Sequence, residues 1–411
     1  MSRRIALIVP VFPVLSETFI IRHWTGLVAR GWDAHIVCAR FDTDAWQRWS
    51  AAFLPATAAR LQRRIHVAPS TSSVVSALRH LPARLGSALA RPLRTATYWH
   101  RSGGAPTARR LKDLYLDGPL IALQPELVHF ELGSLAHGRM HLRHRLDTTV
   151  VVSFRGFDIS FVGLEKPGYY DDVWRHADRL HFLGRDLKRR AEKRGCPVDV
   201  PHDLVAPAVD TTRFDPQPRR PAEDDRLRIV SVGRLVWKKG YELGVRAVRQ
   251  VVDAGVPCTY TLIGDGPEMG AVAYARHRLG LESEVRLKGA LPHARIAEEL
   301  RSADVFLHPA VSEGFCNAVL EAQAMTLPVV TTDADGLAEN VADGETGLVV
   351  PRRSPRALAE ALLRLARDPA AARAMGEAGR RRVQALFRPE QELDAFEALY
   401  ARALEARSAR R

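Results

Sequence analysis

Cysteine is scarce in this sequence, and long apolar runs are missing. The four cysteines (Cys38, Cys196, Cys258 and Cys316) are scattered over 411 residues, with no C-x-x-C pair and no spacing typical of metal ligands. This pattern excludes a disulfide-stapled miniprotein and predicts free thiols in a reducing cytosol. No apolar run reaches the ~18 residues of a membrane span, and residues 5–12 lack a signal-peptide cleavage pattern. We therefore expect a cytoplasmic protein.

Acidic side chains are absent from residues 45–112, which carry twelve arginines and lysines. The formal net charge is +13, of which residues 1–210 contribute +11 (30 basic, 19 acidic) and the rest +2 (30 basic, 28 acidic). A basic face attracts anionic lipid, nucleic acid or phosphorylated substrates, but no RNA-binding motif or zinc finger favours nucleic acid. Two interpretations stay open: the solvated surface of an arginine-rich chain, and contact with an anionic membrane surface, as for a peripheral protein at the inner face of the cytoplasmic membrane.

Short apolar runs alternate with helical patterns along the whole chain, at 46 % hydrophobic and 26 % charged residues. Such alternation predicts parallel sheets with helices on both faces, in an α/β fold. The expected strands include residues 4–9, 34–38, 127–130, 150–153, 179–182, 227–232, 259–263, 285–287, 305–307 and 329–331. The expected helices include residues 16–29, 132–144, 185–194, 242–254, 267–279 and 390–406.

A proline-rich segment at residues 207–226 interrupts this alternation and reads as a linker. The sequence therefore predicts two doubly wound, Rossmann-like domains. Ligands of such sheets bind beyond the carboxyl ends of the strands, so a cleft between two facing sheets is the expected site.

Charged and glycine-rich motifs follow the expected strands of the second half. Gly233 and Arg234 follow one strand, and Lys239 stands five residues beyond Arg234. Two such cations can clamp a diphosphate. The turn Gly264-Asp265-Gly266 follows the next strand, with Pro267 at the expected first helical position.

The segment 313–321 carries the strongest signal. A helix beginning near Phe315 would aim backbone N–H groups at an anion. Glu313, just before that helix, is suited to hold sugar hydroxyls, and Glu321, two turns in, to hold a ribose. Residues 335–340 would place another helix start at the same edge. There is no Walker motif, no G-x-G-x-x-G after the first strand and no paired Asp-x-Asp for Mg²⁺, so we expect no metal and no cofactor.

Taken together, these motifs resemble the retaining glycosyltransferases of family 4 (group 1), whose fold, GT-B, has two facing Rossmann-like domains. The family's E-x7-E motif falls on Glu313 and Glu321. The family's remaining motifs fall on Arg234 and Lys239, on residues 264–267 (GDGP), on 308–315 (with Ala310 for a serine) and on 336–339 (G-x-x-E).

This resemblance implies a particular domain order and set of roles. The domains would be 1–208 with a returning C-terminal helix 388–411, a linker 209–226, and a nucleotide-sugar domain 227–387. Glu313, Arg234 and Lys239 would be catalytic. Donor binding is expected from Gly233, Gly264, Asp265, Gly266, Gly314, Phe315, Cys316, Asn317, Ala318 and Glu321.

The first domain resembles a subgroup that builds bacterial exopolysaccharides, of the colanic-acid type, through residues 12–20, 128–130 and 153–158. Candidates for contact with sugar or acceptor are Ser16, Glu17, Thr18, His129, Arg155 and Asp158. Many members carry histidine where this chain has Arg155. His129 is a candidate for the missing imidazole, although a histidine at a strand end is more often packed.

The resemblance implies transfer of a hexosyl group, with retention, from a UDP- or GDP-sugar to a saccharide or polyprenyl-diphosphate-linked acceptor. In that reading the leaving phosphate accepts the proton of the acceptor, in a front-face substitution. Two alternatives stay open, a nucleotide-sugar 2-epimerase of the same fold and a non-catalytic partner protein that binds a nucleotide.

Overall fold

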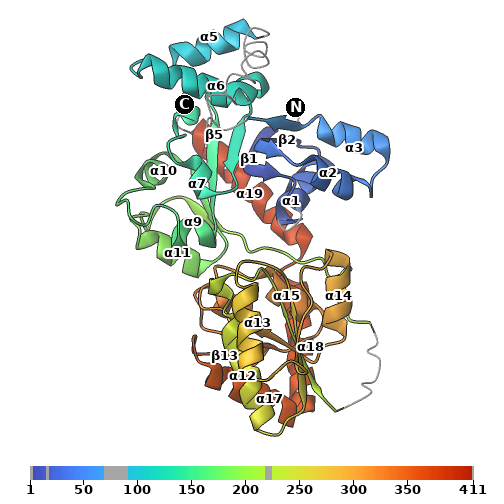
Figure 1. The fold of residues 1–411 in the computed structure, drawn as a ribbon. Coiled ribbons are helices and arrows are strands. Elements are labelled where there is room, and N and C mark those ends of the chain that lie inside the picture. The colour runs from blue at the N-terminus through green and yellow to red at the C-terminus, as the bar shows by residue number, and fades with distance from the viewer. Residues whose placement is uncertain (1–2, 15–17, 69–90, 218–224, 410–411) are drawn as a thin grey trace. The chain divides into compact units, whose positions relative to one another are not determined.

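The computed structural model describes residues 3–14, 18–68, 91–217 and 225–409. The chain forms two compact units (Figure 1). The N-terminal unit comprises Met1–Phe182, Lys188–Val205 and Leu393–Arg411, and the C-terminal unit comprises Leu183–Leu187 and Ala206–Glu392. Each unit is built on one parallel sheet, which confirms the predicted α/β fold with two Rossmann-like units.

The sheet of the N-terminal unit has seven parallel strands in the order β3-β2-β1-β4-β5-β6-β7. Its central strands are buried on both faces, which is why they read as continuous apolar runs. The strands are β1 (Arg4–Phe12), β2 (Asp33–Phe41), β3 (Ile65–Val67), β4 (Leu127–Phe130), β5 (Thr149–Phe154), β6 (Arg179–Phe182) and β7 (His202–Leu204).

The helices along this part of the chain cover the sheet and its edges (Figure 1). The predicted helix 132–144 is wrong as one element, because the chain breaks at Gly138, whose φ is 70°, and forms two short helices instead. The helices are α1 (Thr18–Ala29), α2 (Thr43–Ser50), α3 (Pro55–Gln62), α5 (Pro92–His100), α6 (Thr107–Leu123), α7 (Gly133–Ala136), α8 (His141–Arg145), α9 (Gly156–Ser160), α10 (Asp171–His176) and α11 (Arg185–Glu192).

The sheet of the C-terminal unit has six parallel strands in the order β10-β9-β8-β11-β12-β13. They are β8 (Leu227–Val232), β9 (Cys258–Ile263), β10 (Val285–Leu287), β11 (Val305–His308), β12 (Val329–Thr332) and β13 (Gly347–Val350). The 3₁₀ turn η1 (Trp237–Lys239) is followed by α12 (Tyr241–Asp253), α13 (Met269–Arg278), α14 (His293–Arg301), α15 (Asn317–Ala324), α16 (Leu337–Asn340), α17 (Pro355–Arg367) and α18 (Pro369–Leu386).

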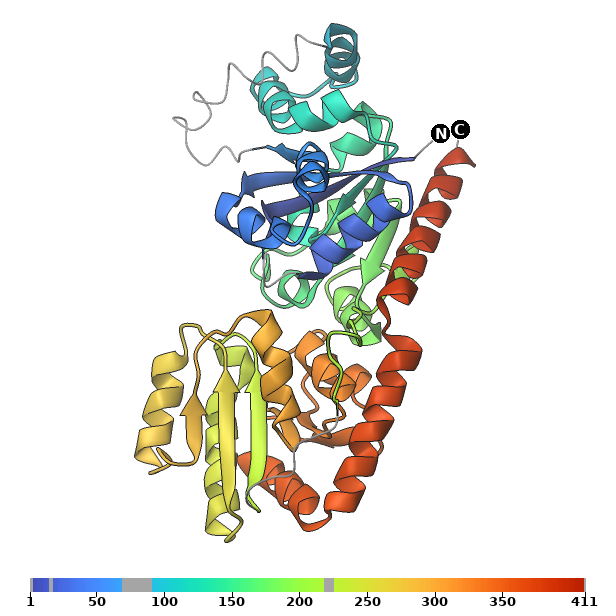
Figure 2. The same cartoon turned by 90° about the vertical axis from the view of Figure 1, so that its right-hand side faces the viewer.

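The last helix, α19 (Pro389–Ser408), packs into the core of the N-terminal unit. Figure 2 shows it in red along the flank of that sheet. Phe396, Leu399 and Tyr400 are buried in the cluster that also holds Trp24 of α1. The indole N–H of Trp32 donates to Glu397 Oε1 at 2.6 Å. The returning C-terminal helix is therefore confirmed.

All four cysteines are free and buried, as the sequence predicts. Within the described ranges, no helix is both long enough and apolar enough to cross a membrane.

We expect truncation of a buried α19 side chain to destabilise the N-terminal unit. Leu399→Ala should lower the free energy of unfolding by about 2–5 kcal/mol, because it leaves a cavity in a packed core. Glu405→Ala, at an exposed position of the same helix, should change it by less than about 0.5 kcal/mol. Urea unfolding followed by circular dichroism measures both, and equal losses in the two variants would show that α19 is not part of this core.

Candidate active site

The motifs of the C-terminal unit meet at the carboxyl edge of its sheet. The strands β9, β8, β11 and β12 are neighbours and parallel, so the loops that follow them emerge side by side. These four loops carry the glycine turn after β9, the Arg234–Lys239 segment after β8, the Glu313 loop after β11 and the Asp335 loop after β12. A sheet of this kind binds ligands at this edge.

Two glycines allow these loops to approach one another closely. A Cβ on Gly264 would lie 1.8 Å from the carbonyl oxygen of Gly233, and the φ of Gly264 is 145°. A Cβ on Gly240, with φ 66°, would lie 2.2 Å from the carbonyl oxygen of Pro309. The backbone of the Lys239 segment is therefore held against the β9 turn on one side and the β11 loop on the other.

A buried ion pair forms where these loops meet. Lys239 Nζ donates a hydrogen bond to Glu313 Oε2, and the two side chains are only 13 % and 9 % exposed. Cys316 Sγ lies 4.0 Å from Lys239 Nζ, and His308 Nε2 lies 3.8 Å from Glu313 Oε2. The structure therefore brings two of the three predicted catalytic residues into direct contact.

Burial and charge act in opposite directions on this pair. Burial raises the pKa of the Glu313 carboxyl, but the neighbouring positive charges, above all Lys239, lower it more, and the pKa falls well below its usual range. Burial lowers the pKa of the Lys239 ammonium, whereas Cys316 and Glu313 raise it above its ordinary value. Both groups are therefore charged at neutral pH.

The β12 loop holds Glu313 in place. Asp335 Oδ2 accepts hydrogen bonds from Ser312 Oγ at 2.6 Å and from the Glu313 backbone N–H at 3.2 Å. The N–H of Gly336 donates to the carbonyl oxygen of Glu313 at 2.9 Å. The predicted helix start at 335–340 is therefore a support for Glu313, and its helix, α16, has only four residues.

Helix α15 begins at Asn317 rather than near Phe315, with Cys316 as its N-cap. The buried amide of Asn340 causes this later start: its Oδ1 accepts from the Cys316 N–H at 3.0 Å, and its Nδ2 donates to the Cys316 carbonyl at 3.2 Å. The Cys316 N–H is therefore already used. The first N–H groups of α15, at Asn317 and Ala318, lack intrahelical acceptors and can meet an anion.

Two corrections concern Glu321 and Pro267, whereas Asp265 lies in the predicted turn. Glu321 is the fifth residue of α15, one turn in rather than two. Pro267 lies in a turn, and α13 begins two residues later at Met269. Asp265 is exposed and supports the turn, with its Oδ1 accepting from the Gly266 N–H at 2.7 Å.

Three further predicted residues, Arg234, Phe315 and Gly314, lie at this edge of the sheet. Arg234 is exposed, and its guanidinium makes no hydrogen bond or ion pair with any residue that the structure describes. Phe315 packs against Phe387, with ring centroids 5.9 Å apart. A Cβ on Gly336 would lie 1.9 Å from the carbonyl oxygen of Gly314, so these two loops also touch.

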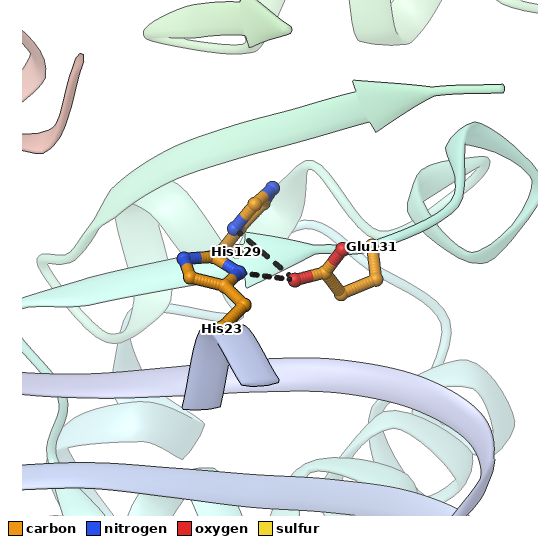
Figure 3. Close-up of side chains that lie close together, drawn as sticks. All are labelled: His23, His129 and Glu131. Atoms are coloured by element: carbon orange, nitrogen blue, oxygen red, sulfur yellow. Dashed lines mark hydrogen bonds and ion pairs between the residues drawn. The ribbon is translucent and has the colours of Figure 1, made fainter. Parts of the chain in front are cut away.

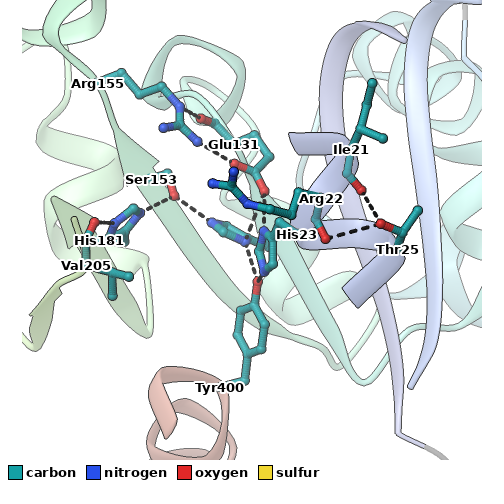
Figure 4. Close-up of polar contacts among 11 residues, drawn as sticks. Ile21, Arg22, His23, Thr25, Glu131, Ser153, Arg155, His181, Val205 and Tyr400 are labelled. Atoms are coloured by element: carbon teal, nitrogen blue, oxygen red, sulfur yellow. Dashed lines mark hydrogen bonds and ion pairs between the residues drawn. The ribbon is translucent and has the colours of Figure 1, made fainter. Parts of the chain in front are cut away.

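A second polar cluster lies in the N-terminal unit, at the carboxyl ends of β4 and β5 (Figure 4). Arg155 Nη2 donates to Glu131 Oε2 at 2.7 Å and its Nε donates to the Glu131 carbonyl at 3.1 Å. The guanidinium also covers the ring of Phe19, 4.0 Å from its centroid. Arg155 is therefore fixed by a carboxylate and an aromatic ring.

Two histidines, His23 and His129, lie beside Glu131 (Figure 3). His23 Nδ1 is 3.1 Å and His129 Nδ1 is 3.7 Å from Glu131 Oε1. His129 Nδ1 also lies 2.7 Å from the Tyr400 hydroxyl of α19, and its Nε2 lies 2.7 Å from Ser153 Oγ. His129 is fully buried, and burial lowers its pKa to about 3. Its imidazole is thus a packed neutral group rather than one open to a ligand.

The remaining candidates for contact with sugar or acceptor either hold the backbone in place or lie outside the described residues. Asp158 is fully buried and accepts from the N–H groups of Arg155 at 3.0 Å and Ser134 at 2.9 Å, so it caps α9. Thr18 is the first residue of α1. Ser16 and Glu17 lie outside the described residues.

Sequence reasoning missed Glu131, His23 and Asn340 as site residues. Glu131 follows the 128–130 motif directly at the end of a central strand, which was a usable signal. His23 stands on α1 and Asn340 on α16, and only the tertiary packing shows their contacts.

Among the residues that the structure describes, two groups of side chains have the chemistry of metal ligands, His308–Glu313–Cys316 and His23–His129–Glu131. In each group a permanent cation already contacts the carboxylate: Lys239 contacts Glu313, and Arg155 contacts Glu131. A divalent cation would be repelled by that charge at close range. Neither group therefore fits a metal site well.

The architecture is that of the GT-B glycosyltransferases. A sucrose-phosphate synthase from Thermosynechococcus elongatus superposes with a TM-score of 0.72 over 98 % of this chain and 100 % of that chain, at 19 % identity. HepE of Anabaena, solved with UDP and glucose, gives a TM-score of 0.71 over 97 % and 99 % of the two chains, at 14 % identity.

Residues 213–382 match the model of the family described as glycosyl transferases group 1. The chain is similar to the colanic acid biosynthesis glycosyltransferase named WcaL of Escherichia coli K12, 28 % identical over 85 % of this chain and 87 % of the relative. It is also similar to the amylovoran biosynthesis glycosyltransferase AmsK of Erwinia amylovora, 29 % identical over 87 % and 89 %.

A double-mutant cycle tests the buried ion pair of the C-terminal unit. Lys239→Met and Glu313→Gln should each lower the free energy of unfolding by about 3–5 kcal/mol, because each leaves the partner's charge buried and unpaired. The double variant should lose clearly less than the sum of the two. Urea unfolding measures all four proteins, and strict additivity would show that the two side chains do not interact.

The same pair predicts a pH dependence. The pKa of Glu313 is lower in the folded than in the unfolded chain, so its contribution to stability is present above its ordinary value of about 4.3 and is lost as pH falls through the folded value. The stability difference between the wild type and Glu313→Gln should therefore shrink as pH falls below about 4. Thermal unfolding between pH 7 and pH 3 measures it. A difference that stays constant would contradict the assigned charge state.

Proposed function

We propose that this protein is a retaining glycosyltransferase of family 4 that acts in the biosynthesis of a bacterial exopolysaccharide. It would transfer a hexosyl group from a nucleoside-diphosphate sugar to a saccharide or lipid-linked saccharide. The observation that carries the proposal is the buried Lys239–Glu313 pair at the carboxyl edge of the C-terminal sheet, beside the start of α15. The names of WcaL and AmsK support the choice of pathway.

The donor's diphosphate would bind near Lys239 and Arg234. Both side chains carry a positive charge, Arg234 is exposed, and the first N–H groups of α15 add the favourable end of a helix dipole. Glu313 would orient hydroxyls of the donor sugar, and Glu321, on the first turns of the same helix, would hold the ribose. HepE, solved with UDP and glucose, supports a nucleoside diphosphate as the donor's leaving group.

The reaction would break the bond between the anomeric carbon and the diphosphate oxygen while the acceptor hydroxyl attacks from the same face. The departing phosphate would take the proton of that hydroxyl. Lys239 and Arg234 would stabilise the charge that develops on the leaving group. Because these side chains supply positive charge next to the carboxylate, we propose that the reaction needs no metal.

The acceptor would bind to the N-terminal unit, at the carboxyl edge where Arg155 lies. Arg155 is 15 % exposed and is held by Glu131, so it can present a fixed positive charge to a phosphate or a sugar hydroxyl. His129 would act through its contacts below Glu131 rather than by touching the acceptor.

We further propose peripheral contact of this unit with the inner face of the cytoplasmic membrane. Residues 45–112 hold no acidic side chain. In the same stretch, the apolar residues Leu54 and Leu93 are 76 % and 83 % exposed to solvent. Basic and apolar groups together favour an anionic lipid surface.

Donor binding and hydrolysis test the proposed reaction. Wild-type protein should bind one of the UDP-, GDP-, ADP- and dTDP-sugars saturably and release its nucleotide slowly, with the same rate in EDTA. Arg234→Ala should weaken donor binding by about tenfold or more, as expected for loss of a charged hydrogen bond. Arg367→Ala, an exposed arginine at the end of α17, should leave it unchanged.

The other outcomes decide between the alternatives. Conversion of the donor to its epimer without an acceptor would favour the 2-epimerase. Binding of a nucleotide without any turnover would favour a non-catalytic partner protein. Loss of nucleotide release in EDTA would contradict the proposed metal independence.

A further inference from the structure

The N-terminal unit contains a cavity at the edge of its sheet opposite to Glu131 and Arg155. Its volume is about 500 Å³. Arg3 precedes β1, Glu126 precedes β4 and Asp147 precedes β5, and all three line it. Because these strands are parallel, the cavity lies at their amino ends, whereas the candidate acceptor residues follow their carboxyl ends. It is therefore separate from the candidate site of this unit.

Two helices complete the walls. α5 contributes Arg94, its C-cap residue is Arg101, and the last turn of α19 contributes Arg407 and Ser408. Figure 2 shows the end of α19 beside the start of β1. α5 is anchored through the Tyr98 hydroxyl, which donates to Asp117 Oδ2 at 2.6 Å. The cavity is therefore built by fixed elements rather than by a single loop.

Positive charge dominates the lining. Five arginines face two carboxylates there: Arg3, Arg94, Arg101, Arg145 and Arg407 against Glu126 and Asp147. Asp147 Oδ1 lies 2.7 Å from a nitrogen of Arg407 and compensates that charge, which leaves Glu126 as the lining carboxylate for the other arginines. Arg145 is neutralised from outside the lining, by Asp113 at 2.7 Å.

The guanidinium groups of Arg3 and Arg101 have no hydrogen-bond or ion-pair partner within the described ranges of the chain. Within the described ranges, the Arg94 guanidinium donates one hydrogen bond, to the carbonyl oxygen of Ala122 at 2.8 Å. The undescribed residues 69–90 contain no aspartate or glutamate. Like charges gathered around one cavity repel one another unless an anion lies between them.

We propose that this cavity binds a phosphate group, as a phosphomonoester or diphosphate. Guanidinium groups match phosphate oxygens in geometry and stay charged at every relevant pH. The volume lies in the range of small-ligand sites, and the mostly polar lining suits a head group rather than an acyl chain. The phosphate belongs either to a soluble ester or to an anionic lipid head group. This inference does not rest on the proposed transferase function.

The test compares two double variants of the full chain. Arg3→Ala/Arg101→Ala removes the two arginines without partners from the cavity. Arg373→Ala/Arg381→Ala removes the same charge from exposed positions of α18, which neither line the cavity nor belong to residues 45–112. Equal melting temperatures of both variants and the wild type establish that each is folded. The soluble probe is glycerol 3-phosphate, measured by calorimetry. The lipid probe is phosphatidylcholine vesicles with and without phosphatidic acid.

We expect the cavity variant to lose about tenfold or more in affinity, since charged hydrogen bonds to phosphate are lost, and the control variant to lose less than about twofold. Repeating the titration in Arg234→Ala removes any contribution from the candidate donor site, and binding to the cavity should persist there. A loss with glycerol 3-phosphate assigns a soluble ester; a loss confined to phosphatidic acid vesicles assigns the lipid head group. No binding by the wild type, or equal losses in the two double variants, would overturn the proposal.

Discussion

The arrangement of the C-terminal unit depends on keeping two opposite charges together out of water. An ammonium and a carboxylate that are both buried lose most of their hydration, and only a close, well-held contact offsets that cost. In this unit the backbone of the neighbouring loops holds the two charged side chains in contact. Gly240 lets the Lys239 segment touch the β11 loop, and Asp335 fixes the backbone of Glu313 from the next loop. The motifs that follow β8, β11 and β12 are thus mostly parts of one support for this ion pair.

The N-terminal unit repeats this scheme with different residues. There, too, a carboxylate after a central strand contacts a permanent cation, Glu131 with Arg155. A histidine from the strand itself lies close by in both units, His308 on β11 and His129 on β4. In the N-terminal unit the contacts extend through Tyr400 to α19, so the position of the C-terminal helix and the polar cluster are linked. An arginine where relatives of the predicted subgroup carry histidine is compatible with this plan, because Glu131 is present to hold it.

Much of the fold could be predicted because central parallel strands bury both faces and therefore appear as apolar runs. The edge strands β3 and β7 have three residues each and none of them is buried, so they do not appear as apolar runs. The candidate catalytic pair could be predicted from motif spacing. The start of α15 could not, because Asn340, 24 residues away, decides it through two hydrogen bonds. The Glu131–Arg155 contact was only partly open to prediction: the position of each residue after a strand was a usable signal, but their pairing depends on which strands are neighbours in the sheet.

The excess of basic residues in the first half of the chain has more than one explanation once these residues are located on the fold. Part of it is ordinary solvated surface, as at Arg63 and Arg109. Another part is neutralised inside the unit, as where Asp117 binds Arg139 and His141. A third part gathers around one cavity at the amino edge of the sheet, where the local carboxylates do not balance it. A solvated surface would scatter its charges, whereas a site for an anion concentrates them on fixed elements. The acid-free stretch 45–112 contributes to both groups, with Arg63 and Arg109 on the solvated surface and Arg94 and Arg101 at the cavity.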